Sequence, residues 1–189
     1  MTDCGFDDKE VETLRLLIDR QAIRDCVETY FHALDSRRFD LLDEVFAPEV
    51  DLADRAPPTP IEELKQLLRG VNQFLVSHHG IRNMRVTVEE DKAHSSCFAL
   101  DTLLVAETHE KEETSPAWPR HDRVPGPYLR SHGLRYIDDL ERRPEGWRIV
   151  RRRGPVVLWR EERSGITVNP AAEQLRDWDW GLHDPRRRD

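Results

Sequence analysis

A stripe of apolar residues at helical spacing near the N-terminus ends in a carboxylate. The stripe recurs every three or four positions and consists of Ile23, Cys26, Val27, Tyr30, Phe31 and Leu34. This spacing predicts an amphipathic helix over about residues 9–34 that buries one face. Asp35 follows at the inner edge of that face, where a carboxylate is costly unless it is paired or hydrogen-bonded. The simpler alternative is that Asp35 only ends the helix, since aspartate is common in turns.

Beyond this helix the hydrophobic pattern changes from a helical to a strand-like period. Two shorter helices are predicted over about residues 39–46 and 60–75, separated by a loop rich in proline and charge at 51–58. A capping box of Thr59 and Glu62 marks the start of the second of them. Five strands are predicted next, at about residues 81–89, 93–107, 129–142, 147–153 and 155–163. The order predicts an α+β fold, in which a cone-shaped, curved antiparallel sheet is closed by the N-terminal helices around an apolar pocket.

The length of 189 residues suits one domain with a substantial core. We expect an N-terminal arm at 1–8, the domain itself over 9–163, and a C-terminal tail or lid at 164–189. A polar, proline-containing segment without periodicity predicts an insertion at about 108–127.

Charge and cysteine content exclude several classes of partner. The formal net charge of −8 argues against nucleic acid or an anionic membrane surface as the main partner. Cys4, Cys26 and Cys97 have no short spacing, which favours neither a zinc ribbon nor a disulfide framework and fits a reducing cytoplasm. The acidic N-terminus lacks the apolar core of a signal peptide, and no apolar run approaches the ~20 residues of a membrane span. We therefore expect a cytoplasmic protein that binds neither nucleic acid nor membrane.

Histidine and aspartate residues supply candidate acid–base groups. His79 stands just before the first strong strand, Asp101 lies within an apolar strand, and His132 stands on the hairpin strand. A pair such as Asp35 and His79 could remove a proton next to a carbonyl, because the carboxylate fixes the imidazole tautomer and stabilises the imidazolium. The remaining histidines have no ligand spacing, and no glycine-rich phosphate loop occurs. We therefore expect no metal site and no cofactor.

Three segments resemble SnoaL-like proteins of the NTF2-like superfamily. They are Ile23-Arg24-Asp25 through Ala47-Pro48, Ser77-His78-His79-Gly80-Ile81-Arg82-Asn83, and Gly133-Leu134-Arg135-Tyr136 through Trp147-Arg148-Ile149. The second segment contains the family's His-x-x-x-Asn pattern. The resemblance spans about residues 11–159 in the right order and spacing, and it implies the cone-shaped α+β fold.

Within that superfamily the chain looks most similar to scytalone dehydratase, hexachlorocyclohexane dehydrochlorinase and bile acid 7α-dehydratase. The resemblance implies a catalytic carboxylate at Asp35 and a catalytic histidine at His79, four residues before the asparagine of the pattern. The tyrosine and the second aspartate of the bile acid enzyme fall on Tyr30 and Asp101. The residues expected to bind substrate are Arg152, His132, Tyr136 and Phe31.

Several of these residues have structural alternatives. Tyr30 could be a core aromatic residue with a satisfied hydroxyl, and Asp101 could form a structural bridge with a buried arginine. Arg151 matches the dehydrochlorinase arginine nearly as well as Arg152 does. The arginine cluster at 148–153 could form an anion site or the solvated faces of a strand.

The resemblance and the residues together predict a cofactor-independent, dehydratase-like lyase or isomerase. Its substrate would be a hydrophobic, carbonyl-bearing small molecule, steroid-like or polyketide-like. Asp35 and His79 would form the base unit, and Tyr30 and Asp101 would assist. The superfamily also contains epoxide hydrolases, polyketide cyclases and non-catalytic binders, so a hydrolase, a cyclase or a binding protein is the alternative. We expect a homodimer or homotrimer joined through the outer face of the sheet, because strand 93–107 is apolar on both faces.

Overall fold

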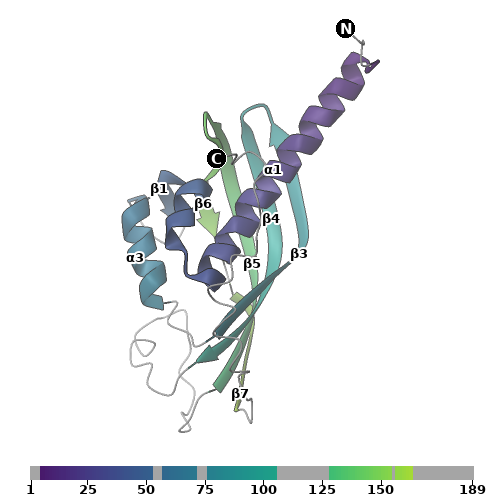
Figure 1. The fold of residues 1–189 in the computed structure, drawn as a ribbon. Helices are drawn as coiled ribbons and strands as arrows, with labels where there is room; N and C mark the ends of the chain where they lie inside the picture. The colour runs from purple at the N-terminus through teal and green to yellow at the C-terminus, as the bar shows by residue number, and fades with distance from the viewer. Residues whose placement is uncertain (1–4, 53–56, 72–75, 106–127, 155, 164–189) are drawn as a thin grey trace, which may run out of the picture.

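A long helix lies along one face of a curved sheet (Figure 1). The computed structural model describes residues 5–52, 57–71, 76–105, 128–154 and 156–163. Helix α1 spans Asp8–Ser36 and begins with a capping box, in which Asp7 and Glu10 each accept the other's backbone N–H at 2.8 Å. It ends at Arg37, whose left-handed backbone lets its N–H donate to the Leu34 carbonyl. The predicted first helix is confirmed, with Asp35 inside its last turn.

The segment after α1 differs from the prediction. A 3₁₀ turn, η1 (Phe39–Leu41), and a short helix, α2 (Leu42–Val45), replace the single helix expected at 39–46. Strand β1 (Phe46–Leu52) follows directly and was not predicted. Pro48 reads as a helix stop, yet it lies where the pairing of β1 with its neighbour shifts register, a position at which a strand tolerates the missing N–H.

Strand β2 (Thr59–Pro60) pairs with β1, so the residues expected to cap the next helix are used in a sheet. Helix α3 (Ile61–Val71) therefore begins at Ile61.

The remaining strands are confirmed with small shifts at their ends. They are β3 (Val76–Glu89), β4 (Lys92–Val105), β5 (Tyr128–Arg143), β6 (Gly146–Arg153) and β7 (Val156–Arg163). Their order is β2-β1-β6-β5-β4-β3, and β7 pairs with β5 beyond the part of β5 that pairs with β6. The α+β class is confirmed. The sheet is mixed because β1 runs parallel to β6, and among the described strands it does not close on itself.

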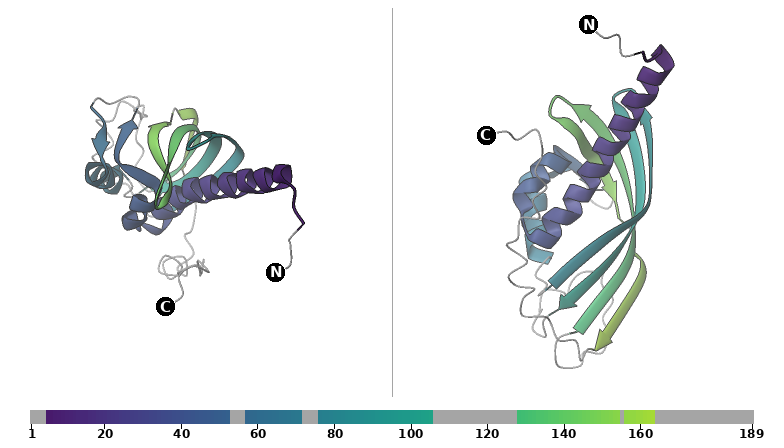
Figure 2. Two further views of the ribbon diagram at one scale, coloured as in Figure 1. Left: turned by 90° about the horizontal axis from the view of Figure 1, so that it is seen from above. Right: turned by 45° about the vertical axis from the view of Figure 1, so that its right-hand side comes forward.

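The core lies between α1 and the inner face of the sheet (Figure 2). Inward residues of β4, such as Cys97 and Ala99, are buried, whereas Phe98 and Leu100 on its outer face are exposed. Of the two apolar faces predicted for this strand, the inner one is therefore buried in the core, whereas Phe98 and Leu100 on the outer one are exposed. No helix in the described ranges is both long and apolar enough to cross a membrane. The predicted insertion at 108–127 and the tail at 164–189 lie outside the described residues.

A clamp fastens the middle of α1 to the hairpin of β5 and β6. Asp19 accepts hydrogen bonds from Arg142 Nη1 at 2.6 Å and Nη2 at 2.8 Å, and from Trp147 Nε1 at 3.2 Å. Arg142 Nε also donates to Asp91 in the turn between β3 and β4 at 2.9 Å. The hydrogen bonds from Arg142 hold the pKa of the Asp19 carboxyl below its ordinary value.

Candidate active site

The last turn of α1 meets β3 through a carboxylate that binds one histidine twice. Asp35 Oδ1 is 2.6 Å from His79 Nδ1, and Asp35 Oδ2 accepts the backbone N–H of His79 at 2.9 Å. The predicted hydrogen bond between these residues is therefore present. With the ring proton on Nδ1, directed at Asp35, the lone pair of Nε2 is left for a ligand. His78, the preceding residue, is exposed.

The charge state of Asp35 follows from this contact. Burial alone would raise the pKa of the carboxyl. The hydrogen bonds and the charge of His79 outweigh burial and hold the Asp35 pKa below its ordinary value. Asp35 is thus the carboxylate partner of His79 at neutral pH.

The sheet register sets a second His–Asp pair beside the first. His79 on β3 lies opposite Asp101 on β4, and Asp101 lies opposite His132 on β5. Asp101 Oδ1 accepts the His132 backbone N–H at 2.7 Å, and Oδ2 is 3.0 Å from His132 Nδ1. Oδ2 is also 3.8 Å from His79 Nε2. We call Asp35, His79, Asp101 and His132 the His–Asp row, in which Asp101 lies between the two histidines.

The bridge with a buried arginine, which was the structural alternative for Asp101, is made by Asp138, a residue that sequence reasoning missed. Arg152 Nε and Nη2 donate to the Asp138 carboxylate at 2.7 and 2.8 Å, and both residues are buried. The Arg152 guanidinium carbon also lies 4.1 Å from the ring centroid of Tyr30 and 4.8 Å from that of Tyr136. Arg152 therefore faces the interior, whereas Arg151 is exposed.

Aromatic rings connect the His–Asp row to this buried arginine. The Phe31 ring lies 5.6 Å from the His79 ring and 5.3 Å from the Tyr136 ring, and Tyr30 packs edge-on against both Phe31 and Tyr136. Burial raises the pKa of the Tyr30 hydroxyl, despite the nearby charge of Arg152, and raises that of Tyr136 further. Both hydroxyls are therefore neutral at physiological pH and can act as hydrogen-bond donors.

Arg130 is a second buried cation that sequence reasoning missed. It precedes His132 by two residues on β5, so both side chains lie on the inner face of the sheet, where both are buried. The alternation of side chains along β5 could have identified Arg130, because it lies an even number of residues from His132, Tyr136 and Asp138 and so shares their face of the sheet.

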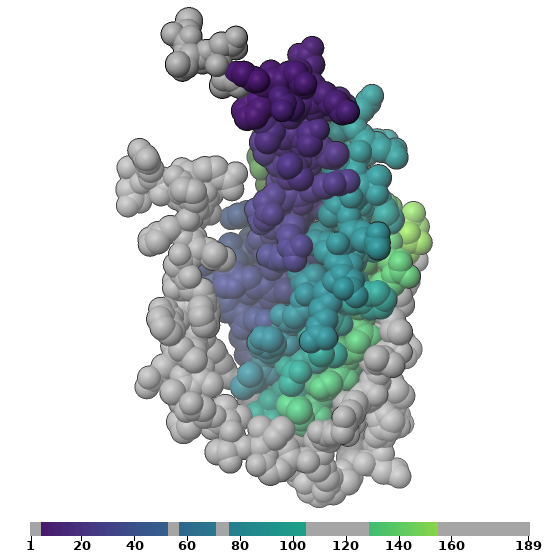
Figure 3. Space-filling view, turned by 90° about the vertical axis from the view of Figure 1, so that its right-hand side faces the viewer, coloured from purple at the N-terminus to yellow at the C-terminus, as the bar shows by residue number. Residues whose placement is uncertain are grey.

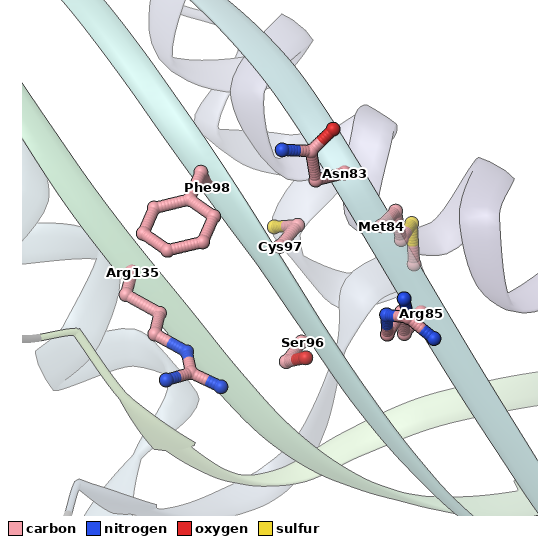
Figure 4. Close-up of a pocket in the computed structure, with 7 residues that line it drawn as sticks. All are labelled: Asn83, Met84, Arg85, Ser96, Cys97, Phe98 and Arg135. Carbon is pink, nitrogen blue, oxygen red and sulfur yellow. The ribbon is translucent and has the colours of Figure 1, made fainter.

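A hollow of about 630 Å³ lies between β3, β4 and β5 (Figure 4). It is lined by Asn83, Met84, Arg85, Ser96, Cys97, Phe98 and Arg135. It sits at a register shift between β3 and β4, where Asn83 takes a left-handed φ of 52°. No residue of the His–Asp row lines this hollow, so the candidate acid–base residues lie outside it. The apolar pocket expected inside the cone stays a prediction.

Metal ligands do not gather at the row. In the part of the chain that the structure describes, no group of three or more His, Cys, Asp or Glu side chains is placed to hold a metal ion.

A long helix over a curved mixed sheet, with a His–Asp pair where the helix ends, gives this chain an α+β fold that is shared with a solved NTF2-like protein from Novosphingobium aromaticivorans. The chain belongs to the SnoaL-like domain family, whose model matches residues 15–153. A curated relative, uncharacterized protein Rv2910c of Mycobacterium tuberculosis (strain ATCC 25618 / H37Rv), is 30% identical over 153 residues, which cover 79% of this chain and 92% of that protein.

Solved structures share the fold at lower identity. Hexachlorocyclohexane dehydrochlorinase LinA-type3 from Novosphingobium barchaimii LL02 has a TM-score of 0.64 and 18% identity, covering 84% of this chain and 99% of that chain. A scytalone dehydratase-like protein from Novosphingobium aromaticivorans DSM 12444 has a TM-score of 0.58 and 19% identity, covering 84% and 96%. Proteins of this fold thus include dehydratases and dehydrochlorinases.

Proposed function

We propose that this protein is a cofactor-independent lyase or isomerase of the dehydratase type, with His79 as its base. The observation that carries the proposal is the double contact between Asp35 and His79, to ring Nδ1 at 2.6 Å and to the backbone N–H at 2.9 Å. A histidine held by one carboxylate at its ring Nδ1 and at its backbone N–H has a fixed ring orientation and tautomer, which a general base requires.

The reaction begins with transfer of a proton from a carbon next to a carbonyl to His79 Nε2. The C–H electron pair moves into the enolate, and the imidazolium that forms lies between two carboxylates, Asp35 at Nδ1 and Asp101 at 3.8 Å from Nε2. In a dehydration, Nε2 then returns the proton to the departing hydroxyl group as the enolate forms the new C=C bond. In an isomerisation, Nε2 returns it to another carbon.

Asp101 assists in this mechanism through its contacts with both histidines. Its oxygens accept two hydrogen bonds from His132 when the ring proton of His132 is on Nδ1. As a carboxylate in this position, Asp101 stabilises positive charge on His79. His132 is fully buried, so in this mechanism it holds Asp101 and does not contact the substrate.

The aromatic residues bind and polarise the substrate. Phe31 and Tyr136 supply apolar contact area beside His79. The neutral hydroxyl of Tyr30 donates a hydrogen bond to the developing enolate oxygen. Arg152, stacked on the Tyr30 ring and bound to Asp138, keeps that ring in place.

A panel of bicyclic and tricyclic β-hydroxyketones in D₂O tests the proposal. Water loss is followed by the absorbance of the conjugated enone, and proton abstraction by deuterium exchange at the carbon next to the carbonyl, detected by NMR. The wild-type protein is expected to catalyse at least one of the two reactions on a panel member. Tight binding of panel members with neither reaction would favour a non-catalytic binding protein.

A further inference from the structure

The N-terminal half of α1 carries a second apolar face. Leu14, Leu17 and Ile18 are 40%, 53% and 67% exposed, and Val11 lies one turn earlier. With 3.6 residues per turn, Val11, Leu14 and Ile18 form one line along the helix, roughly opposite the line that contains the buried Ile23. We call Val11, Leu14, Leu17 and Ile18 the outer stripe.

Nothing in the described part of the protomer covers the outer stripe. The N-terminal turns of α1 extend past the end of the sheet (Figures 1 and 2) and stand at the surface of the molecule (Figure 3). An exposed apolar stripe of this kind marks a contact site.

The charges beside the outer stripe are complementary to those of a second α1 that runs in the opposite direction. Asp8 and Arg15 are two turns apart, so they flank the stripe on the same side. Both are exposed, and neither has an ion-pair partner among the described residues. A second α1 running in the opposite direction would bring its Arg15 to Asp8 and its Asp8 to Arg15.

We propose that the outer stripe docks against the outer stripe of a second copy of this chain in an antiparallel pair related by a two-fold axis. The register that joins Asp8 to the partner's Arg15 also sets Val11 beside the partner's Leu14. The same register brings Phe6, an exposed residue just before α1, to the partner's Leu17 and Ile18. Apolar and charged contacts are thus satisfied in one register, as an isologous interface requires.

The size of this contact sets its strength. Residues 6–18 span about 20 Å, so the contact buries less surface area than a standard protein–protein interface. We therefore expect a reversible dimer with a dissociation constant in the micromolar range. The contact involves neither the His–Asp row nor the exposed face of β4, and it does not depend on the proposed function.

Sedimentation equilibrium of the full-length chain under reducing conditions, from about 1 to 200 μM, tests the pairing. Ile18→Glu places a charge against Phe6 of the second copy at each end of the contact. We expect the dissociation constant of the α1–α1 contact to rise by about 100-fold or more, so that the measured mass of the assembly falls by half. Circular dichroism verifies that the variant is folded.

A charge exchange tests the antiparallel register itself. Asp8→Arg and Arg15→Asp should each weaken pairing by up to about 10-fold, because each sets two like charges together, and the double variant should restore it. Leu100→Gln, an exposed apolar residue on β4, is the matched control and should leave the response to the charge exchange unchanged. A wild-type mass equal to that of Ile18→Glu, or a double variant no better than the single ones, would overturn the proposal.

Discussion

The two His–Asp pairs of the row have the same geometry and different surroundings. In each pair the carboxylate binds both the ring Nδ1 and the backbone N–H of one histidine, with ring contacts of 2.6 Å for Asp35–His79 and 3.0 Å for Asp101–His132. The Asp35 and His79 side chains are 27% and 7% exposed, whereas those of Asp101 and His132 are 7% and 0% exposed. The first pair is the more accessible of the two through its carboxylate, and in the proposed mechanism it is the reacting pair and the buried pair supports it.

A third pair provides an internal reference for this comparison. His94 Nδ1 lies 2.8 Å from Asp139 Oδ1 on the outer face of the sheet, and both side chains are largely exposed. An exposed pair of this kind is worth little in stability and has no closed surroundings in which to do chemistry. Its residues therefore offer matched substitutions.

The largest expected effect is that of His79→Gln. Loss of the base should lower kcat by about 10³-fold or more, as measured by enone formation on the best panel substrate. His94→Gln should leave kcat unchanged. If the His79 variant turned over substrate near the wild-type rate, the Asp35–His79 pair would be no more important for activity than the exposed His94–Asp139 pair. The binding-protein alternative would then be favoured.

Asp35→Asn should be nearly as damaging, with a loss of about 10²–10³-fold in kcat. The amide keeps the shape of the carboxylate but cannot stabilise the imidazolium. Asp139→Asn is the control, and near-ultraviolet circular dichroism reports whether packing is retained. Unchanged kcat in a folded Asp35→Asn protein would show that His79 does not need this partner.

Tyr30→Phe should reduce kcat by about 10–100-fold, the loss of one hydrogen bond to the transition state. Substrate affinity should change little, because the ring and its packing remain. If Tyr30 is only a core residue, kcat will stay at the wild-type value while the free energy of unfolding falls.

His132→Gln tests whether the buried pair acts through Asp101. We expect a loss of about 10-fold in kcat with a displaced pH–rate profile, because Asp101 is no longer held against His79. Urea unfolding should show a loss of about 1–3 kcal/mol from the buried hydrogen bonds. A stability loss with an unmoved pH profile would leave His132 a purely structural residue.

The smallest expected effect is the contribution of Asp35 to acid stability. Its pKa in the folded protein is below the ordinary value of 3.8, so its stabilising effect is present above that pH and is lost as the pH falls through the folded-state pKa. The difference in free energy of unfolding between wild type and Asp35→Asn should be constant above about pH 5 and shrink below 3.8. A difference that grows on acidification would contradict the lowered pKa.

The helix and the long strands were predictable because periodicity marks them locally. The Asp35–His79 contact was implied by the family resemblance, in which the His-x-x-x-Asn pattern selects His79 over His78. The partner of Asp101 was not predictable. A tight turn at Glu90–Asp91 sets the register of β3 against β4, whereas the long segment 106–127 separates β4 from β5 and leaves their register open.

Two kinds of error have physical reasons. Prolines at 48 and 60 suggested a helix stop and a helix start, although a register shift and a two-residue strand accommodate them. Arg130 and Asp138 were not singled out from the sequence, because the cost of burying a charge is normally prohibitive. The Arg152–Asp138 pair shows how a partner inside the fold offsets that cost.

The clamp at Asp19 has a consequence for how the chain is made. Asp19 and Arg142 are 123 residues apart, so α1 leaves the ribosome long before the hairpin that fastens it. At about 5–20 residues per second, the helix waits roughly 6–25 seconds for its partners. Throughout that interval the apolar inner face of α1 lacks the hairpin that fastens it in the folded protein. Until synthesis is nearly complete, nascent α1 is therefore a natural substrate for a chaperone that holds apolar helices.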